Sequence, residues 1–238
     1  MRFRVRLVRA TEDSLPISLD YRRRFISLLK KIFGEEFEEE RPKPYTFAVY
    51  LGKSAKIEGE HIKDVEAINF RFSTGDSETA ISFYNGTLRL IKENYLHDMN
   101  PKLGSVYFRI VDVDVEKENE PTGFFKTLSP VVVERAVNSK NPKEKYATPK
   151  DRDFMWWLLE NTQRRYRSIV GKDLELKTFE FEPISIKEEF IKHYGGYIRS
   201  FLGRFRLYTE SKELLKFVYQ YGLGVRTGQG FGYLECMV

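Results

Sequence analysis

The sequence is poor in the residues that build metal sites and covalent cross-links. It has one cysteine, Cys236, and three histidines, His61, His97 and His193, among 238 residues. A single cysteine excludes an intramolecular disulfide and a zinc site made of cysteines. The three histidines lie far apart and lack the spacing of a zinc-binding motif. We therefore expect a chain that works without a metal ion and without a cofactor.

Long apolar runs are also absent. No stretch approaches the roughly 18 consecutive apolar residues that a membrane-spanning helix needs. The opening residues, Met-Arg-Phe-Arg-Val-Arg-Leu, lack the apolar core of a signal peptide. No G-x-x-x-x-G-K-S/T motif is present, which excludes a nucleotide-binding P-loop. These absences predict a cytoplasmic protein with no membrane partner.

The composition is that of a globular protein, with 41% hydrophobic and 15% aromatic residues. Basic residues number 40 and acidic residues 35, which gives a formal net charge of +5. An excess this small affects binding only where basic side chains gather in a stripe or a cleft. The placement of the charges is therefore more informative than their total.

The first half of the chain carries a regular order of expected elements. Residues 2–8 alternate basic and apolar side chains, the period of a strand with one face in a core. Asp20 is expected to cap a helix over residues 21–33. The further elements expected here are strands over 45–51 and 66–72, a helix over 77–94 and a strand over 106–115. The resulting order, β-α-β-β-α-β, is that of a ferredoxin-like domain, which RNA-recognition domains share.

The second half repeats this order after a polar, turn-rich segment at residues 119–123. Its expected elements are a strand over 126–134, a helix over 150–169, strands over 174–186 and 197–208, a helix over 211–221 and a last strand over 230–237. We therefore predict an α+β fold of two tandem ferredoxin-like domains, residues 1–119 and residues 120–238.

Five glycines fall within residues 222–232, just before the expected last strand. Glycine permits positive φ and lets another chain approach the backbone N–H groups closely. Arg226, Thr227 and Gln229 are interleaved with these glycines, so the segment is typical of a loop shaped around an anionic ligand. The alternative is a flexible turn that leads into a strand.

Basic and aromatic side chains alternate elsewhere in a pattern typical of RNA-binding surfaces. Cationic side chains track a phosphate backbone and aromatic rings stack on bases. The alternative for each basic residue is a solvated surface position. The candidates for RNA binding are Arg22, Arg23, Lys192, Arg199, Arg204, Arg206, Gly224, Arg226, Thr227, Gly228, Gln229 and Gly230.

Four segments together resemble a known family. The tail Gly-Leu-Gly-Val-Arg-Thr-Gly-Gln-Gly-Phe-Gly at 222–232 resembles the signature of RAMP-superfamily CRISPR proteins. Residues 1–8, 42–47 and 125–133 narrow the resemblance to the Cas-six family, the endoribonuclease that processes CRISPR precursor RNA. The resemblance implies a basic cleft between two ferredoxin-like domains. It also implies metal-independent cleavage, in which an RNA 2′-hydroxyl leaves a 2′,3′-cyclic phosphate and a 5′-hydroxyl.

The resemblance transfers only part of the family's catalytic set. Many members have a general-base histidine that would fall near Phe37, and none stands there. The family's lysine falls on Lys43, so we expect Lys43 to stabilise the phosphate. Lys30 or Lys31 would assist proton transfer or charge stabilisation, and Tyr45 is a further candidate whose alternative is a position in the core. Members without the histidine include active enzymes and proteins that only bind RNA, so both functions stay open.

The expected partner is CRISPR repeat RNA, as precursor and as processed guide RNA. Contacts with other CRISPR effector subunits and a homodimer are left open. His61 and His193 are alternative candidates for the general base, and surface positions are the alternative for both. A general RNA-binding protein of the same fold is a third hypothesis.

Overall fold

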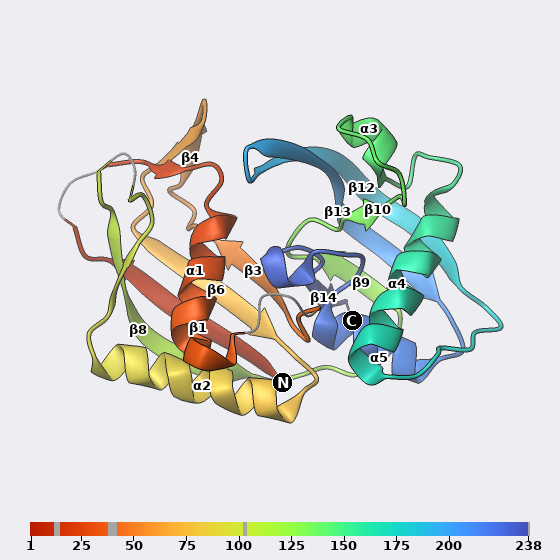
Figure 1. Cartoon of the computed structure of the whole chain (residues 1–238), viewed down its shortest axis with the longest axis horizontal. Coiled ribbons are helices and arrows are strands. Elements are labelled where there is room, and N and C mark those ends of the chain that lie inside the picture. Colours follow the sequence, from red (N-terminus) through yellow and green to blue (C-terminus); the bar gives the residue numbers. More distant parts are fainter. Residues whose placement is uncertain (12–14, 38–41, 102–103, 238) are drawn as a thin grey trace.

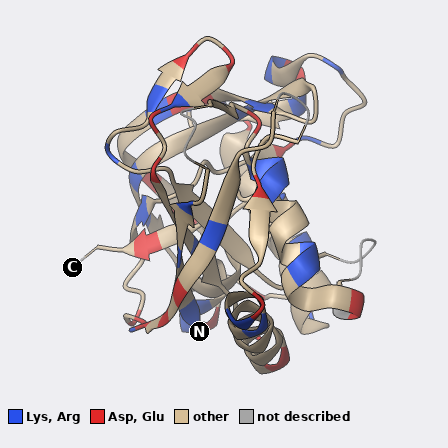
Figure 2. Cartoon of the chain, turned by 90° about the vertical axis from the view of Figure 1, so that its left-hand side faces the viewer, with Lys and Arg blue, Asp and Glu red and all other residues tan. Residues whose placement is uncertain are grey.

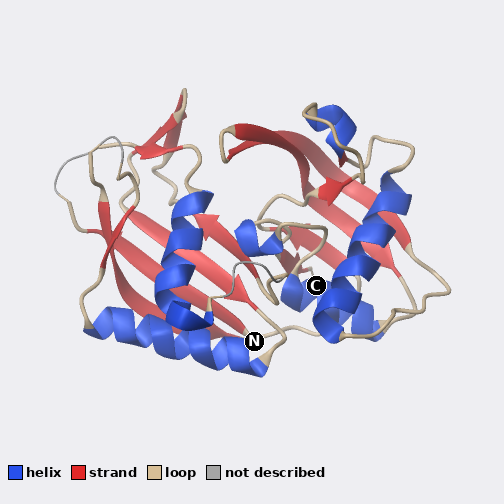
Figure 3. Cartoon of the chain, viewed as in Figure 1, coloured by secondary structure: helices blue, strands red, loops and turns tan. Residues whose placement is uncertain are grey.

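Two antiparallel sheets lie side by side, and each carries helices on one face (Figure 1 and Figure 3). The computed structural model describes residues 1–11, 15–37, 42–101 and 104–237. The first sheet belongs to the N-terminal half of the chain and the second to the C-terminal half, so the predicted α+β class is confirmed.

The N-terminal sheet has the strand order β3-β6-β1-β8-β7. It consists of β1 (Arg2–Arg9), β3 (Thr46–Tyr50), β6 (Ala67–Ser73), β7 (Leu96–Asp98) and β8 (Tyr107–Glu116), with α1 (Arg22–Phe33) and α2 (Ser77–Lys92) packed on it. The central strand β1 pairs with both β6 and β8. This is the predicted ferredoxin-like topology. A small sheet of β2 (Ile17–Ser18), β5 (His61–Lys63) and β4 (Lys56–Glu58) extends from its upper end (Figure 1).

Helix α1 does not begin as predicted. Its N-cap position is Tyr21, and no side chain caps it. The carboxylate of Asp20 instead contacts His193 and the backbone N–H of Tyr194 in the other half of the molecule. The predicted cap was wrong because these long-range partners take up the Asp20 oxygens. A local pattern carries no information about them.

Helix α2 runs unbroken through Gly86, although glycine weakens an isolated helix. A Cβ at this position would overlap the carbonyl oxygen of Ile32 on α1. The glycine is therefore the point where the two helices approach most closely, and packing outweighs the lower helix propensity.

The C-terminal sheet has the order β12-β13-β9-β14, the same topology again. Its strands are β9 (Phe124–Thr127), β12 (Glu180–His193), β13 (Gly196–Tyr208) and β14 (Leu234–Cys236), and its helices are α4 (Phe154–Val170) and α5 (Lys212–Tyr221). The short pair β10 (Val133–Glu134) and β11 (Tyr146–Ala147) flanks the small helix α3 (Pro142–Lys145). Strand β8 ends before and β9 begins after the turn-rich 119–123 segment, and the domain boundary at 119 stays a prediction.

The strand expected over residues 126–134 is interrupted. Strand β9 ends at Thr127, and the chain then leaves the sheet. Its backbone groups bond the glycine-rich tail instead: Gly232 donates to the carbonyl of Pro130, and Val225 donates to that of Val132. Propensity alone predicted a continuous strand, and a segment more than 90 residues away supplies the competing partners.

The two halves are joined by the first strand and the last. The guanidinium of Arg2 lies 4.2 Å from the ring centroid of Tyr219 and 4.3 Å from that of Tyr233. It also donates 2.7 Å to the carbonyl of Leu234, and the side chain is only 1% exposed. Within the described parts of the chain, no helix combines the length and the apolar character needed to cross a bilayer.

Candidate functional site

The glycine-rich segment 222–232 lies where the two halves meet, packed against β3 and the chain before it. Thr46 donates from its hydroxyl to the carbonyl of Phe231 over 2.9 Å. Gly224 has a φ of +77°, and a Cβ there would overlap the carbonyl oxygen of Val132. The segment is therefore a closely packed loop with a fixed course, which the short 3-10 helix at Thr227–Gln229 reinforces.

One buried cation holds this loop in place. Arg165, on α4, donates to the carbonyls of Gly222 and Gly224 over 2.8 and 3.1 Å. It donates also to the Thr227 hydroxyl over 3.0 Å, and that hydroxyl donates to the carbonyl of Tyr45 over 2.9 Å. Burial lowers the pKa of Arg165 to about 10, so it stays charged at neutral pH. Among the described residues no carboxylate pairs with it, so its positive charge is uncompensated.

A cavity of about 450 Å³ lies beside the loop. Helix α1 contributes Lys30, the segment before β3 contributes Lys43, and α4 contributes Arg164 and Arg165. The loop contributes Arg226, Thr227, Gly228 and Gln229. Five basic side chains from four parts of the chain thus face one cavity. Elsewhere on the N-terminal half, basic and acidic positions are interspersed (Figure 2).

The two cavity lysines share an aromatic neighbour. The ammonium of Lys43 lies 4.5 Å from the ring centroid of Phe37, and that of Lys30 lies 5.6 Å from the same centroid. Phe37 also lines the cavity. Phe37, near which the family resemblance would place a histidine, is therefore at the site. Its phenyl ring cannot transfer a proton.

Gly228 fixes the distance between the loop and Lys43. A Cβ at Gly228 would lie 2.6 Å from Cγ of Lys43, closer than real Cβ atoms approach. The loop backbone is thus in direct contact with the lysine side chain, so a displacement of the loop at Gly228 would change the packing of Lys43.

Two catalytic candidates lie elsewhere. Lys31 is exposed and does not line the cavity. Tyr45 is 3% exposed, and its ring stacks on Phe33 at 5.7 Å. Burial raises the pKa of the Tyr45 phenol. Tyr45 therefore lies in the core, which was the alternative to a catalytic position, and it does not line the cavity.

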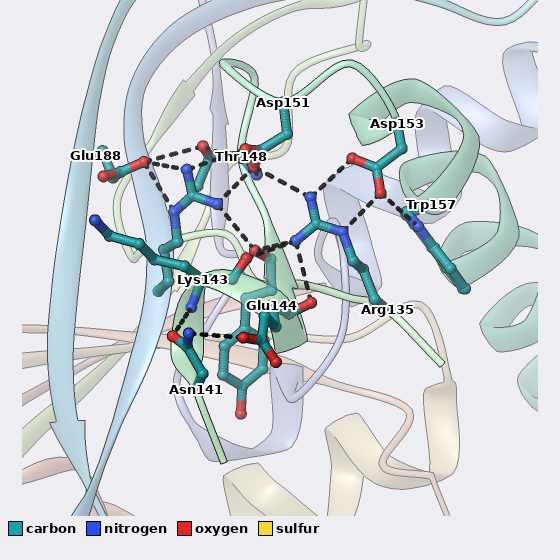
Figure 4. A network of polar contacts seen from close by, with 11 residues as sticks. Arg135, Asn141, Lys143, Glu144, Thr148, Asp151, Asp153, Trp157 and Glu188 are labelled. Atoms are coloured by element: carbon teal, nitrogen blue, oxygen red, sulfur yellow. Dashed lines mark hydrogen bonds and ion pairs between the residues drawn. The ribbon is translucent and has the colours of Figure 1, made fainter. Parts of the chain in front are cut away.

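Several of the RNA-binding candidates are engaged within the protein. Arg199 is 6% exposed and forms ion pairs of 2.6 Å with Asp151 and 2.7 Å with Glu188. These carboxylates belong to a polar network that continues through Arg135 to Asp153 (Figure 4). The arrangement gives Arg199 a structural role in the C-terminal half.

The remaining basic candidates divide into two groups. Arg22 lies with its guanidinium 5.4 Å from the ring centroid of Phe231, so it adjoins the loop. Arg23 lies 4.7 Å from that of Tyr194, which lines the cavity. Arg204 and Arg206 are exposed and pair with β9, toward the far end of β13 from the hairpin tip. The structure thus brings Arg22 and Arg23 close to the loop and leaves these two on another surface.

The C-terminal part of the chain, residues 114–236, matches the family described as "CRISPR associated protein Cas6, C-terminal". The chain belongs to the Cas6 family. The resemblance seen in the sequence is thereby confirmed.

Curated relatives agree with this assignment. A CRISPR-associated endoribonuclease-like protein Cas6 of Pyrococcus furiosus is 36% identical over 138 residues, which are 56% of each chain. A protein of Pyrococcus horikoshii, named as a CRISPR-associated endoribonuclease-like protein Cas6nc, is 32% identical over 152 residues, 62% of this chain and 63% of its own. The matches thus span less than two thirds of these relatives.

Solved structures share the fold over the whole chain. The structure of a Cas6-related gene product of Pyrococcus furiosus aligns with a TM-score of 0.84 and 26% identity, covering 100% of this chain and 98% of the other. A structure described as a RAMP protein binding different RNA substrates aligns with a TM-score of 0.81 and 21% identity over the full length of both. The tandem ferredoxin-like fold is therefore that of Cas6 proteins.

Sequence reasoning missed Arg164 and Arg165. They stand in the sequence Gln-Arg-Arg-Tyr-Arg of α4. Nothing in this basic run indicates that Arg165 is buried while Arg164 is exposed. His193 was considered as a surface residue and is 4% exposed. Arg165 and His193 are recognised by their contacts with the glycine-rich loop, and these contacts exist only in the folded chain.

Proposed function

We propose that this Cas6-family chain is an endoribonuclease that binds and cleaves CRISPR repeat RNA in precursor transcripts to give guide RNAs. The single observation that carries the proposal is the cavity where Lys30, Lys43 and the buried charge of Arg165 face the glycine-rich loop. The naming of the Pyrococcus furiosus relative as an endoribonuclease-like protein supports RNA as the substrate.

The proposed reaction is an attack of the RNA 2′-hydroxyl on the adjacent phosphate. The phosphorus–oxygen bond to the 5′ oxygen of the next nucleotide breaks. The 2′-hydroxyl gives its proton to water and the leaving 5′ oxygen takes one up from water or from a lysine ammonium at the cavity, which leaves a 2′,3′-cyclic phosphate and a 5′-hydroxyl. Negative charge grows on the phosphate in the transition state, and cations fixed beforehand around it lower the barrier. Lys43 and Lys30 would supply this charge at the cavity. No step in this scheme requires a metal ion.

Proton removal from the 2′-hydroxyl is the slow part of this proposal. An unperturbed lysine has a pKa near 10.4 and is almost fully protonated at neutral pH, which makes it a poor base. Much of the acceleration would then come from holding the RNA with the 2′-oxygen, the phosphorus and the leaving oxygen in line. Arg22, Arg23 and Arg226 would hold the flanking phosphates, together with N–H groups of the loop.

A second function is favoured by one observation. Phe37 lies beside both lysines, near where many Cas6 proteins place a histidine. Without a base at this position, the same cleft would serve a protein that binds repeat RNA and does not cut it. Both proposals use the same contacts with RNA, and they differ only in whether the RNA is cut.

The test is cleavage of a labelled RNA of the CRISPR repeat from the genome that encodes this chain, under single-turnover conditions in EDTA. We expect a product with a cyclic-phosphate end. Lys43→Ala and Lys30→Ala should each slow cleavage about 100-fold, as the loss of one transition-state charge does elsewhere, and should weaken RNA binding far less. Lys31→Ala on the same helix is the matched comparison, and it should change the rate less than about threefold because its ammonium lies outside the cavity.

Three outcomes would change the assignment. Tight, repeat-specific binding with no cut product over long incubation would select the binding protein. Equal affinity for the repeat and for an unrelated RNA of the same length would refute both CRISPR functions. Loss of cleavage in EDTA that is restored by a divalent ion would refute the metal-independent reaction.

A further inference from the structure

The tip of the hairpin formed by β12 and β13 reaches from the C-terminal half across to the N-terminal half (Figure 1). The tip contacts the N-terminal half through Lys192, His193 and Tyr194. Lys192 pairs with Glu60 at the surface. Beside this pair, His193 is buried and lies between Asp20, just before α1, and Gln229 of the glycine-rich loop.

The first side of His193 is anchored to the N-terminal half. Its Nδ1 lies 3.3 Å from Oδ1 of Asp20. Oδ1 of Asp20 and Oε1 of Gln229 both only accept hydrogen bonds, so the ring donates on both sides when both of its nitrogens carry a proton. The other Asp20 oxygen accepts from the backbone N–H of Tyr194 over 3.0 Å and from Arg23 over 3.4 Å. With these contacts on its carboxylate, Asp20 is a fixed point for the imidazole.

The second side of His193 is bonded to the loop. Its Nε2 lies 3.2 Å from Oε1 of Gln229, and its ring meets the ring of Phe231 edge-on at 5.4 Å. Arg226 also approaches Oε1 of Gln229, at 3.5 Å. An arginine only donates, so this contact favours the amide oxygen on that side.

The loop transmits this constraint to the proposed catalytic lysine. Gln229 follows Gly228, whose backbone lies directly against the side chain of Lys43. A loop that shifts by an ångström would therefore displace both the Gln229 amide and Lys43. Displacements of this size can cost about 100-fold in rate.

We propose that His193 is a positioning residue of the reaction, which fixes the glycine-rich loop and, through it, Gln229 and Lys43. This inference rests on the proposed function. His193 does not touch the substrate in this role, because it is 4% exposed and does not line the cavity. The hydrogen-bonded series Asp20–His193–Gln229 sets the geometry of the site from outside it.

The test separates the chemical step from binding. His193→Phe removes both hydrogen bonds and keeps a ring against Phe231. We expect it to lower the single-turnover cleavage rate of the repeat RNA about 10-fold or more, with less than about a threefold change in the RNA concentration for half-maximal rate. Asp20→Asn is the milder second variant and should give a smaller loss of the same kind. Glu60→Gln is the control, since it breaks only the neighbouring surface pair, and it should leave the rate unchanged.

A double-mutant cycle tests whether the effect passes through Gln229. Gln229→Met removes the amide, and His193→Phe should then cause little further loss, because coupled residues are not additive. Losses that multiply would overturn the inference. So would an equal loss in Glu60→Gln, which would mean that any loosening of the hairpin has the same effect.

An RNA-free measurement keeps this inference separate from the proposed function. The side-chain amide resonance of Gln229, assigned by its absence in Gln229→Met, should shift in folded His193→Phe and in Asp20→Asn but not in Glu60→Gln. An unchanged resonance would overturn the link even if the enzyme cleaves RNA. If the variants show the shift but the wild-type protein never cleaves its repeat RNA, the result counts against the proposed function and confines His193 to loop positioning.

Discussion

At residue 37 a phenyl ring lies close to two ammonium groups, at the place where the proposed proton transfer would use an imidazole. Phe37 is within reach of both Lys30 and Lys43, so the cations are in place and the base is missing. We therefore expect residue 37 to limit the rate of the proposed cleavage and the two lysines to be required for it.

Phe37→His should accelerate cleavage. A positioned general base contributes about 100-fold or more to proton-transfer steps, and the two cations already face the ring's position. The rate should rise between pH 6 and pH 8 as the new imidazole loses its proton, and Phe37→Gln, which cannot act as a base, is the matched control. An equal rate in both variants would show that proton removal does not limit the reaction. Single-turnover rates with repeat RNA measure the effect.

Single residues were predictable from the sequence only where a motif carried them. Lys43 and the loop glycines stand in segments that resemble the Cas6 family, and Lys30 follows from the basic end of the first helix. The role of Arg165 could not be predicted, and His193 was considered only as an alternative general base, because their partners lie 56–62 and 36–173 residues away in the chain. Asp20 was predicted as a helix cap for the same reason: its true partners are remote.

At the scale of elements, the packing of α1 on α2 depends on one glycine. Gly86 lets the backbone of α2 approach the last turn of α1, because a Cβ at this position would overlap the carbonyl oxygen of Ile32. The same last turn carries Lys30, so the stability of this contact bears on the site.

Gly86→Ala should destabilise the protein by about 1–3 kcal/mol, the usual range for overpacking, although alanine favours helix formation by about 1 kcal/mol over glycine. The exposed neighbour Asn85→Ala is the control, and it should be neutral or slightly stabilising because no partner helix meets it. Urea unfolding followed by circular dichroism gives both values. A stabilised Gly86→Ala would mean that the helices can separate without cost.

The order of elements was predictable because each half repeats strand and helix periods that depend on local sequence. The break after Thr127 was not, since of the residues that follow Val131 alone bridges to Phe201 of β13, while Pro130 and Val132 accept from the glycine-rich loop. The predicted end of this strand was therefore wrong at the point where the residues after Thr127 meet the glycine-rich loop.

At the scale of the molecule, Arg2 joins the halves. It is buried between Tyr219 and Tyr233 and bonds the last strand. Arg2→Leu would leave the Tyr233 hydroxyl and the Leu234 carbonyl without this donor, a change that costs about 1–3 kcal/mol for each unsatisfied group.

We expect Arg2→Leu to lower the melting temperature and to separate one calorimetric unfolding transition into two, because the halves would no longer unfold together. Arg4→Leu is the control on the same strand. Its guanidinium pairs with Asp114 at the surface, where such pairs contribute about 0–1 kcal/mol. A single, equally shifted transition in both variants would contradict the coupling.

The burial of the glycine-rich loop between the halves also orders events during synthesis. The hydrogen bonds of Arg2 to Tyr233 and Leu234 join residues that are 231 and 232 positions apart. Domains generally fold as units, the N-terminal one first while the chain is still being made. The surface of β3 that later receives the loop must then stay uncovered until residues 222–232 have been synthesised. Synthesis of the glycine-rich loop, rather than the folding of the N-terminal half, therefore sets the moment at which the cavity can form.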